Sequence, residues 1–86
     1  MDPAQEAIAR ALSGEWKKAI EINQRILEDH PNDIEALNRL ARAHAETGDL
    51  EKAKKTSLKV LHIDPYNKIA AKCLAKWKKG RAGKEN

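Results

Sequence analysis

The chain has 86 residues, which is enough for one small domain with a limited core. Only 3 % of the residues are aromatic and Phe is absent, whereas Ala, Leu, Ile, Lys and Glu dominate, so the composition favours helices over a strand-rich fold. The formal net charge of +4 is unevenly placed: residues 1–67 carry 10 Lys and Arg against 12 Asp and Glu, and residues 68–86 carry 7 against 1.

Two helices are predicted within residues 2–32. Asp2 can cap the first helix, and Pro3 suits the first helical position, where its missing N–H costs nothing. Apolar residues then recur with helical spacing as far as Leu12, and Gly14 ends the stripe. The second helix should run from about residue 15 to residue 29, because a residue that precedes a proline, here Pro31, is pushed out of the helical region.

A second pair of helices is predicted within residues 33–66. Asp33 can cap a helix that runs to about residue 47, and Gly48 suits the left-handed position that follows a helix. The next helix should begin at Leu50 and end near residue 63, before Pro65. Residues 2–32 and 33–66 are therefore each expected to form a helical hairpin.

A fifth helix is predicted over residues 67–79, with Gly80 at its end. Its apolar residues lie on one side, as expected of a single helix that covers the last hairpin. Residues 80–86 contain two glycines and three charges without an apolar pattern, which predicts a flexible basic tail.

The two hairpins repeat each other at a spacing of 34 residues. The matched pairs are Gly14 with Gly48, Lys18 with Lys52, Ala19 with Ala53, Leu27 with Leu61, and Pro31 with Pro65. A repeat of this length indicates a stacked array of hairpins, because one hairpin cannot bury its apolar face without a neighbour.

The spacing of Leu37, Leu40, Ala41 and His44, followed by Ala53, Ser57 and Pro65, resembles the tetratricopeptide repeat pattern. The resemblance implies an all-α fold, an α-solenoid of about two repeats and a C-terminal capping helix, spanning residues 1–79. It also implies a non-catalytic scaffold for protein–protein interaction. His44 and Ser57 stand where the pattern has Tyr and Phe, and we expect a hydrogen bond between them in place of the aromatic contact.

A binding groove is expected on the concave side of this array, where the first helix of each hairpin lies. Residues one turn apart on successive first helices should line it, which selects Asn38 and Arg42 in the second hairpin and Lys72 and Lys76, 34 residues on. Arg and Lys in such a row would hold an acidic peptide or partner helix through charge-assisted hydrogen bonds. The alternative is that these are ordinary solvated charges.

Other interpretations remain open at this stage. Trp16 is either a core residue between repeats or an exposed anchor. Two hairpins are few for a stable array, so the chain could instead be a self-assembling unit, or an engineered or truncated repeat fragment. A homo-oligomer interface would then use the apolar side of the fifth helix: Ile69, Cys73, Leu74 and Trp77. The basic C-terminal segment also suggests nucleic-acid binding, which is the weakest of these hypotheses.

Catalysis, metals and cofactors find no support in the sequence. No nucleophile, base and acid set, Gly-rich phosphate loop or metal-ligand spacing is evident, so no enzyme, metal or cofactor is predicted. A lone cysteine, the absence of a membrane-length apolar stretch and the absence of a signal peptide indicate a cytoplasmic protein.

Overall fold

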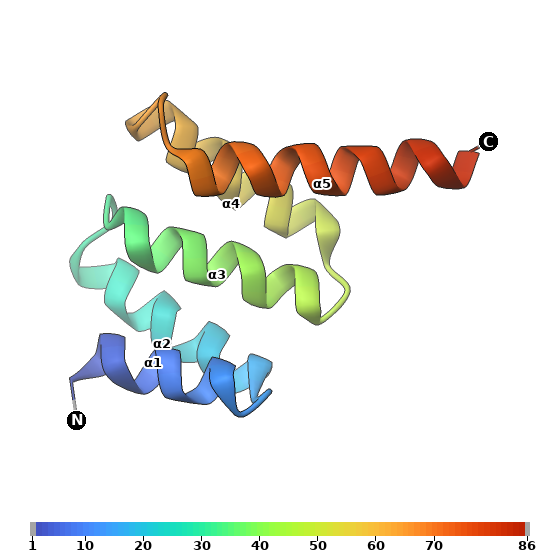
Figure 1. The fold of residues 1–86 in the computed structure, drawn as a ribbon. Coiled ribbons are helices and arrows are strands. Elements are labelled where there is room, and N and C mark those ends of the chain that lie inside the picture. Colours follow the sequence, from blue (N-terminus) through green and yellow to red (C-terminus); the bar gives the residue numbers. More distant parts are fainter. Residues whose placement is uncertain (1, 86) are drawn as a thin grey trace.

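The computed structural model describes the backbone of residues 2–85 and the side chains of residues 2–77. It contains five helices and, within residues 2–85, no strand (Figure 1). The predicted all-α class is thus confirmed. The helices are α1 (Pro3–Leu12), α2 (Trp16–Asp29), α3 (Ile34–Glu46), α4 (Leu50–Ile63) and α5 (Lys68–Glu85).

The helices stack as antiparallel hairpins in two layers. Helix α1 packs against α2 and α3 packs against α4, while α2 contacts α3 and α4 contacts α5, so each hairpin rests on its neighbour. In Figure 1, α1, α3 and α5 form the near layer, and α2 and α4 lie behind them. This arrangement confirms the predicted α-solenoid.

The same turn closes both hairpins. Gly14 and Gly48 have positive φ angles of 76° and 90°. After α3, the Gly48 N–H donates to Ala45 O and the Asp49 N–H donates to His44 O, and the corresponding pair of bonds follows α1. This Schellman arrangement satisfies the last carbonyls of each first helix and turns the chain into the second.

Side-chain caps begin four of the helices, two of them at the predicted cap residues Asp2 and Asp33. Asp2 Oδ1 accepts the Ala4 N–H at 2.8 Å at the start of α1. Asp33 Oδ1 accepts the Ala36 N–H at 3.0 Å, and Asp49 Oδ1 accepts the Lys52 N–H at 3.1 Å. Asn67 Oδ1 accepts the Ala70 N–H at 2.9 Å at the start of α5. Each bond satisfies an N–H group that has no partner within its own helix.

Helix α5 continues to Glu85 rather than ending at Gly80. Glycine lowers helix propensity by about 1 kcal/mol relative to Ala but does not block the helix as proline does, and the Lys, Arg, Ala and Glu residues around it favour helix. The side chains of the expected tail, residues 80–86, lie outside the described part.

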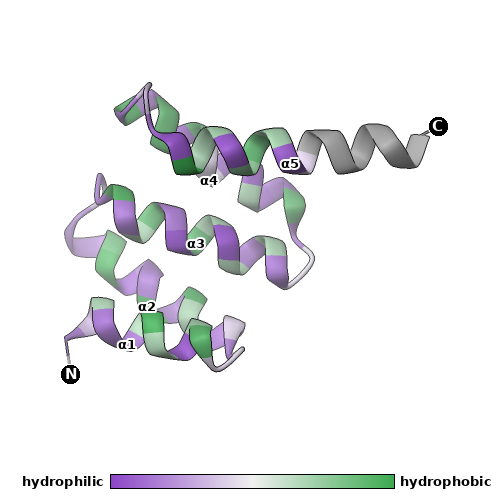
Figure 2. Cartoon of the chain, viewed as in Figure 1, coloured by the Kyte–Doolittle hydropathy of each residue, from purple (hydrophilic) through white to green (hydrophobic). Residues whose placement is uncertain are grey.

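The core consists mostly of small residues, with one aliphatic cluster near the C-terminal side. Hydrophobic and hydrophilic residues alternate along the helices, so each helix has an apolar stripe to bury (Figure 2). Leu37, Val60 and Ala70 form a buried cluster that joins α3, α4 and α5. The other buried apolar residues are Ala7, Ala19, Ile22, Ala36, Leu40, Ala41, Ala43 and Ala53.

Among the side chains of residues 2–77, three polar ones are buried: Asn23, His44 and Ser57. The hydrogen bond expected between His44 and Ser57 is wrong, because the fully buried Ser57 Oγ has no hydrogen-bond partner among the described residues.

Within residues 2–85, no helix has both the length and the apolarity to cross a membrane.

Candidate functional site

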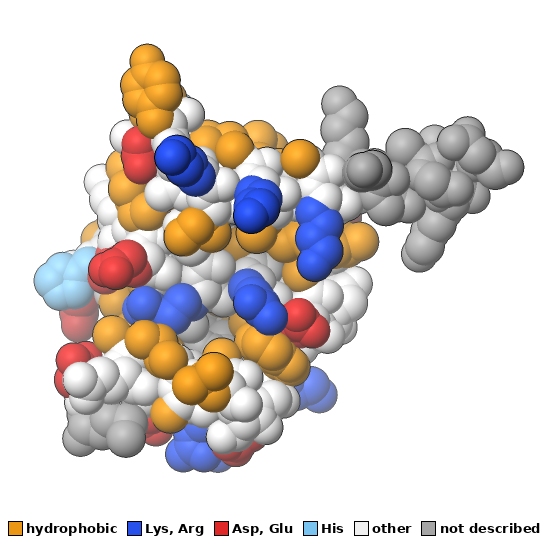
Figure 3. All heavy atoms as spheres, in the orientation of Figure 1, with side chains coloured by type: hydrophobic (Ala, Val, Ile, Leu, Met, Phe, Trp, Pro, Cys, Tyr) orange, Lys and Arg blue, Asp and Glu red, His pale blue; other side chains and the backbone are white. Residues whose placement is uncertain are grey.

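A groove of about 640 Å³ opens on the layer formed by the first helix of each hairpin. Its walls come from α1, α3 and α5, and α2 contributes residues between α1 and α3. Figure 3 shows this face, with Lys and Arg side chains over α3 and α5 and hydrophobic side chains between them and over α1. The lining residues are Ile8, Ala11, Leu12, Trp16, Ala19, Asn23, Glu35, Asn38, Arg39, Arg42, Ile69 and Cys73.

The groove offers apolar surface to solvent at both ends. Ile8 and Leu12 of α1 are 44 % and 84 % exposed, and Ile69 of α5 is 59 % exposed. Trp16 is half-buried at the start of α2 and also lines the groove. Exposed apolar side chains gathered in one concavity are a feature of interaction sites.

Arg42 lies over the Trp16 ring in the groove. Its Cζ is 5.7 Å from the ring centroid of Trp16, within the range of a cation–π contact. Its Nε lies 3.7 Å from Glu46 Oε2, one turn along α3. The Arg42 side chain is 68 % exposed, so the guanidinium remains accessible from solvent.

Arg39 is held in a different way, by a buried amide from the preceding hairpin. Asn23 is fully buried; its Nδ2 donates to Ala19 O at 3.0 Å and its Oδ1 accepts the Arg39 Nε–H at 3.0 Å. Both ends of the amide are therefore satisfied, which offsets the cost of burying it. The bond fixes the Arg39 side chain, which is half-buried in the groove wall.

Asn38 connects α3 to the start of α5. Its Nδ2 donates to Asn67 Oδ1 at 3.3 Å, and Asn67 Nδ2 donates to Asp64 Oδ2 at 3.3 Å. One N–H of the Asn38 amide is thus used to hold the two helices together. The rest of its side chain faces the groove.

Residues predicted for the peptide-binding site and residues predicted for the oligomer interface line the same groove, although the sequence suggested two distinct surfaces. Asn38 and Arg42, predicted for peptide binding, line the groove; so do Ile69 and Cys73, predicted for an oligomer interface. Lys72 and Lys76 are exposed on α5 but are not lining residues, and Leu74 and Trp77 are half-buried outside the lining.

Sequence reasoning missed Asn23 and Arg39. The only available signal was that Asn23 and Ser57, 34 residues apart, put polar side chains where the repeat pattern has Phe. The pairing of Asn23 with Arg39 depends on how the two hairpins stack, which spacing within one hairpin does not specify.

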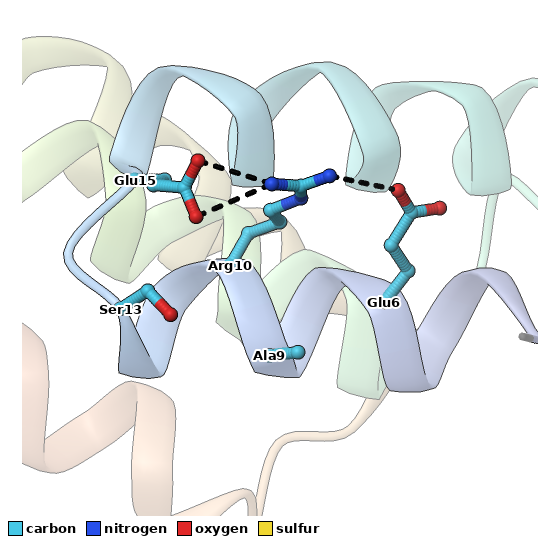
Figure 4. A pocket seen from close by; sticks show the side chains of 5 residues that line it. All are labelled: Glu6, Ala9, Arg10, Ser13 and Glu15. Carbon is cyan, nitrogen blue, oxygen red and sulfur yellow. Dashed lines mark hydrogen bonds and ion pairs between the residues drawn. The ribbon is translucent and has the colours of Figure 1, made fainter.

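A second hollow lies beside the turn that follows α1, and its charged lining residues pair with one another (Figure 4). The Arg10 guanidinium lies between two carboxylates, with Nη1 3.0 Å from Glu15 Oε1 and Nη2 3.7 Å from Glu6 Oε2. The pair with Glu15 connects α1 to the residue that precedes α2, and the pair with Glu6 lies within α1. A cation already paired with two acids on its own chain is a structural feature rather than an anion site.

The pKa of His44, which does not line the groove, is shifted. Burial lowers the pKa of His44 below its ordinary value of 6.5; Asp49 raises this pKa and Lys52 lowers it further. Within the described residues, no group of three His, Cys, Asp or Glu side chains could hold a metal ion. The groove is therefore the candidate site.

The stacked hairpins and the open groove define a helical-repeat interaction module. A family model described as tetratricopeptide repeat matches residues 10–76, and the chain belongs to this family, as the sequence pattern predicted. Tetratricopeptide repeats generally mediate protein–protein interaction.

The chain is also similar to three curated mammalian proteins called FK506-binding protein-like. The protein of Mus musculus and that of Homo sapiens are each 40 % identical to it over 73 residues, and that of Rattus norvegicus is 38 % identical over 73 residues. In each case the match covers 85 % of this chain and 21 % of the relative. The chain therefore spans about a fifth of the length of these relatives.

Proposed function

We propose that the chain is a non-catalytic, cytoplasmic binding module that takes a peptide or partner helix with acidic groups into the groove between α1, α3 and α5. The observation that carries this proposal is the composition of the groove: exposed apolar side chains at its ends and two arginines, Arg39 and Arg42, on its central helix. The exposed Lys72 and Lys76 extend the cationic surface along α5.

The charges of the groove favour an acidic partner. Its only acidic lining residue in the described part is Glu35, against the two arginines. A guanidinium binds a carboxylate through two parallel N–H···O bonds, and an apolar surface beside it excludes water and strengthens the interaction. A neutral, wholly polar peptide would use neither feature.

The proposal is tested with synthetic acidic peptides that contain apolar residues, whose binding is followed by calorimetry. We expect the double variant Arg42→Glu/Lys76→Glu to lose binding, because two attractive charges become repulsive, while its helical circular dichroism is unchanged. The control is Lys55→Glu/Lys59→Glu, which makes the same charge change at exposed positions of α4, a helix that contributes no described lining residue. Binding that survives in the groove variant, or is lost equally in the control, would place the site elsewhere.

Self-association is a second candidate function, because Ile69 is 59 % exposed at the groove edge. In this alternative a second copy would cover the apolar side of α5. Sedimentation equilibrium decides between the two: a chain that stays monomeric at high concentration does not form the homo-oligomer. Nucleic-acid binding by the C-terminal segment rests largely on Lys78, Lys79, Arg81 and Lys84, whose side chains lie outside the described residues.

A further inference from the structure

The groove has one cation whose orientation is set by the fold before any ligand binds. Arg39 Nε donates to the buried Asn23 Oδ1 at 3.0 Å, and Asn23 is itself anchored to Ala19 O. Arg42, in contrast, is 68 % exposed and is shared between the Trp16 ring and Glu46. The two arginines thus differ in how much side-chain freedom a ligand would have to remove.

The repeat itself supplies a comparison for this pair. Thirty-four residues after Asn23 stands Ser57, and 34 residues after Arg39 stands Cys73. Ser57 is also fully buried, but its Oγ has no partner among the described residues. The interface between the first two helix pairs therefore has a satisfied buried amide and an arginine, whereas the equivalent positions of the next interface have neither. Stacking of hairpins does not by itself require this pair.

The bond to Asn23 leaves the outer edge of the Arg39 guanidinium for a ligand. Nε uses its one N–H on Asn23, and within the described side chains no other hydrogen bond or ion pair of Arg39 is present. The two terminal nitrogens form a fork that matches a carboxylate. Glu35, one turn earlier on α3, is the only acid that lines the groove among residues 2–77.

The groove residues around Arg39 indicate which ligand side chains would flank the carboxylate. Ile8, Leu12 and Trp16 lie on the α1 and α2 side of the groove, and Ile69 and Cys73 lie on the α5 side. A ligand that places one carboxylate on Arg39 would therefore present apolar side chains on both sides of it.

On the basis of the proposed function, we infer that the partner segment carries a single Asp or Glu flanked by large apolar residues. Arg39, positioned by Asn23, is the residue that binds this carboxylate. Lys72 and Lys76 lie outside the groove lining and add attraction without selecting this position. Asn23 acts as a positioning residue, because it contacts Arg39 and holds its Nε.

The test uses an array of nine-residue peptides with Leu, Ile or Phe on each side of a central residue that is Glu in one member of each pair and Gln in the other. Binding to the full chain is measured by the fluorescence of Trp16 in a Trp77→Phe background. The quantity of interest is the ratio of the Gln-peptide Kd to the Glu-peptide Kd. This ratio reports selection of the carboxylate and does not change when a variant merely loses stability.

For the wild-type sequence at position 39 we expect a ratio of about 10 or more, since a hydrogen bond between charged groups exceeds a neutral one by this factor. Arg39→Gln should bring the ratio to about 1, because the charge is removed. Asn23→Leu and Arg39→Lys keep the positive charge but lose the fixed fork, and both should give a ratio of about 3. Lys72→Gln/Lys76→Gln should lower the ratio much less than Arg39→Gln does, because these lysines lie outside the groove lining and attract the carboxylate only from a distance.

The outcomes separate the two proposals. If no peptide of either series binds, the proposed function fails and this inference fails with it. If peptides bind with a ratio near 1, or if the ratio survives Arg39→Gln, this inference alone is overturned. A dimer in solution that Ile69→Asp dissociates, and that peptides do not displace, would make a second copy the occupant of the groove and would also overturn it.

Discussion

His44 shows how one polar substitution at a packing position affects stability. It occupies the position of Tyr in the repeat pattern, lies 7 % exposed in α3 and faces the start of α4, where Asp49 and Lys52 influence its charge. Burial lowers its pKa in the folded chain, so the folded state prefers the neutral imidazole. The unfolded chain takes up the proton near the ordinary pKa of 6.5.

Stability should therefore fall on acidification. The contribution of His44 is fully present above pH 6.5 and is lost as the pH falls through the lowered pKa of the folded chain, because the unfolded state binds the proton more readily. We expect the free energy of unfolding, measured in urea at pH 7.5 and pH 5.5, to fall less in His44→Gln than in the parent chain. The exposed His30 provides the control. If His30→Gln changes the pH dependence of the free energy of unfolding as much as His44→Gln does, this assignment is contradicted.

At the level of the helices, the hairpin turns rely on backbone conformation. Gly14 and Gly48 both adopt positive φ, and a Cβ built on either glycine meets no atom within 4 Å. Any effect of a side chain at these positions must therefore come from the backbone rather than from a clash. The Schellman bonds depend on this conformation at both turns.

Gly48→Ala should lower the free energy of unfolding by about 1 kcal/mol, the typical cost of a left-handed conformation for a residue with a Cβ. Gly48→Asn should cost less, since Asn tolerates this region better than Ala does. Unfolding in urea measures the loss of stability in both variants. The slope of the unfolding free energy against urea concentration should stay unchanged. Equal losses for the two variants would show that φ is not the cause.

At the scale of the whole molecule, stability depends on the stacking of successive helix pairs. The core is built largely of alanines, and its aliphatic cluster, Leu37, Val60 and Ala70, joins α3, α4 and α5. An 86-residue chain has a total stability of only about 4–13 kcal/mol, so the loss of one such contact is a large fraction of the total.

Leu37→Ala should therefore cost about 2–4 kcal/mol, the usual range for truncating a buried leucine. Leu12→Ala, which changes a side chain that is 84 % exposed, should change stability by less than about 0.5 kcal/mol. Thermal unfolding followed by circular dichroism compares the two. Similar melting temperatures for both variants would show that the cluster around Leu37 does not hold the helices together.

Much of the fold was readable from the sequence because its signals are local. Apolar spacing, the prolines and the glycines placed the first four helices to within a residue or so, and the 34-residue period gave their stacking. The end of α5 was not readable, because a glycine inside a helix weakens it without stopping it. The bond expected between His44 and Ser57 failed for a related reason: its length depends on how far apart two helices pack, which the residue types do not specify.

The sequence by itself determined the class of the protein: a helical repeat whose first helices share one face, with Asn38 and Arg42 on that face. Only the tertiary structure decided which neighbours complete the groove, bringing Ile69 and Cys73 into the lining, leaving Lys72 and Lys76 outside it and joining Asn23 to Arg39. The physical reason is that periodicity fixes the face on which a side chain lies, whereas a contact between hairpins depends on the distance and angle at which their helices pack.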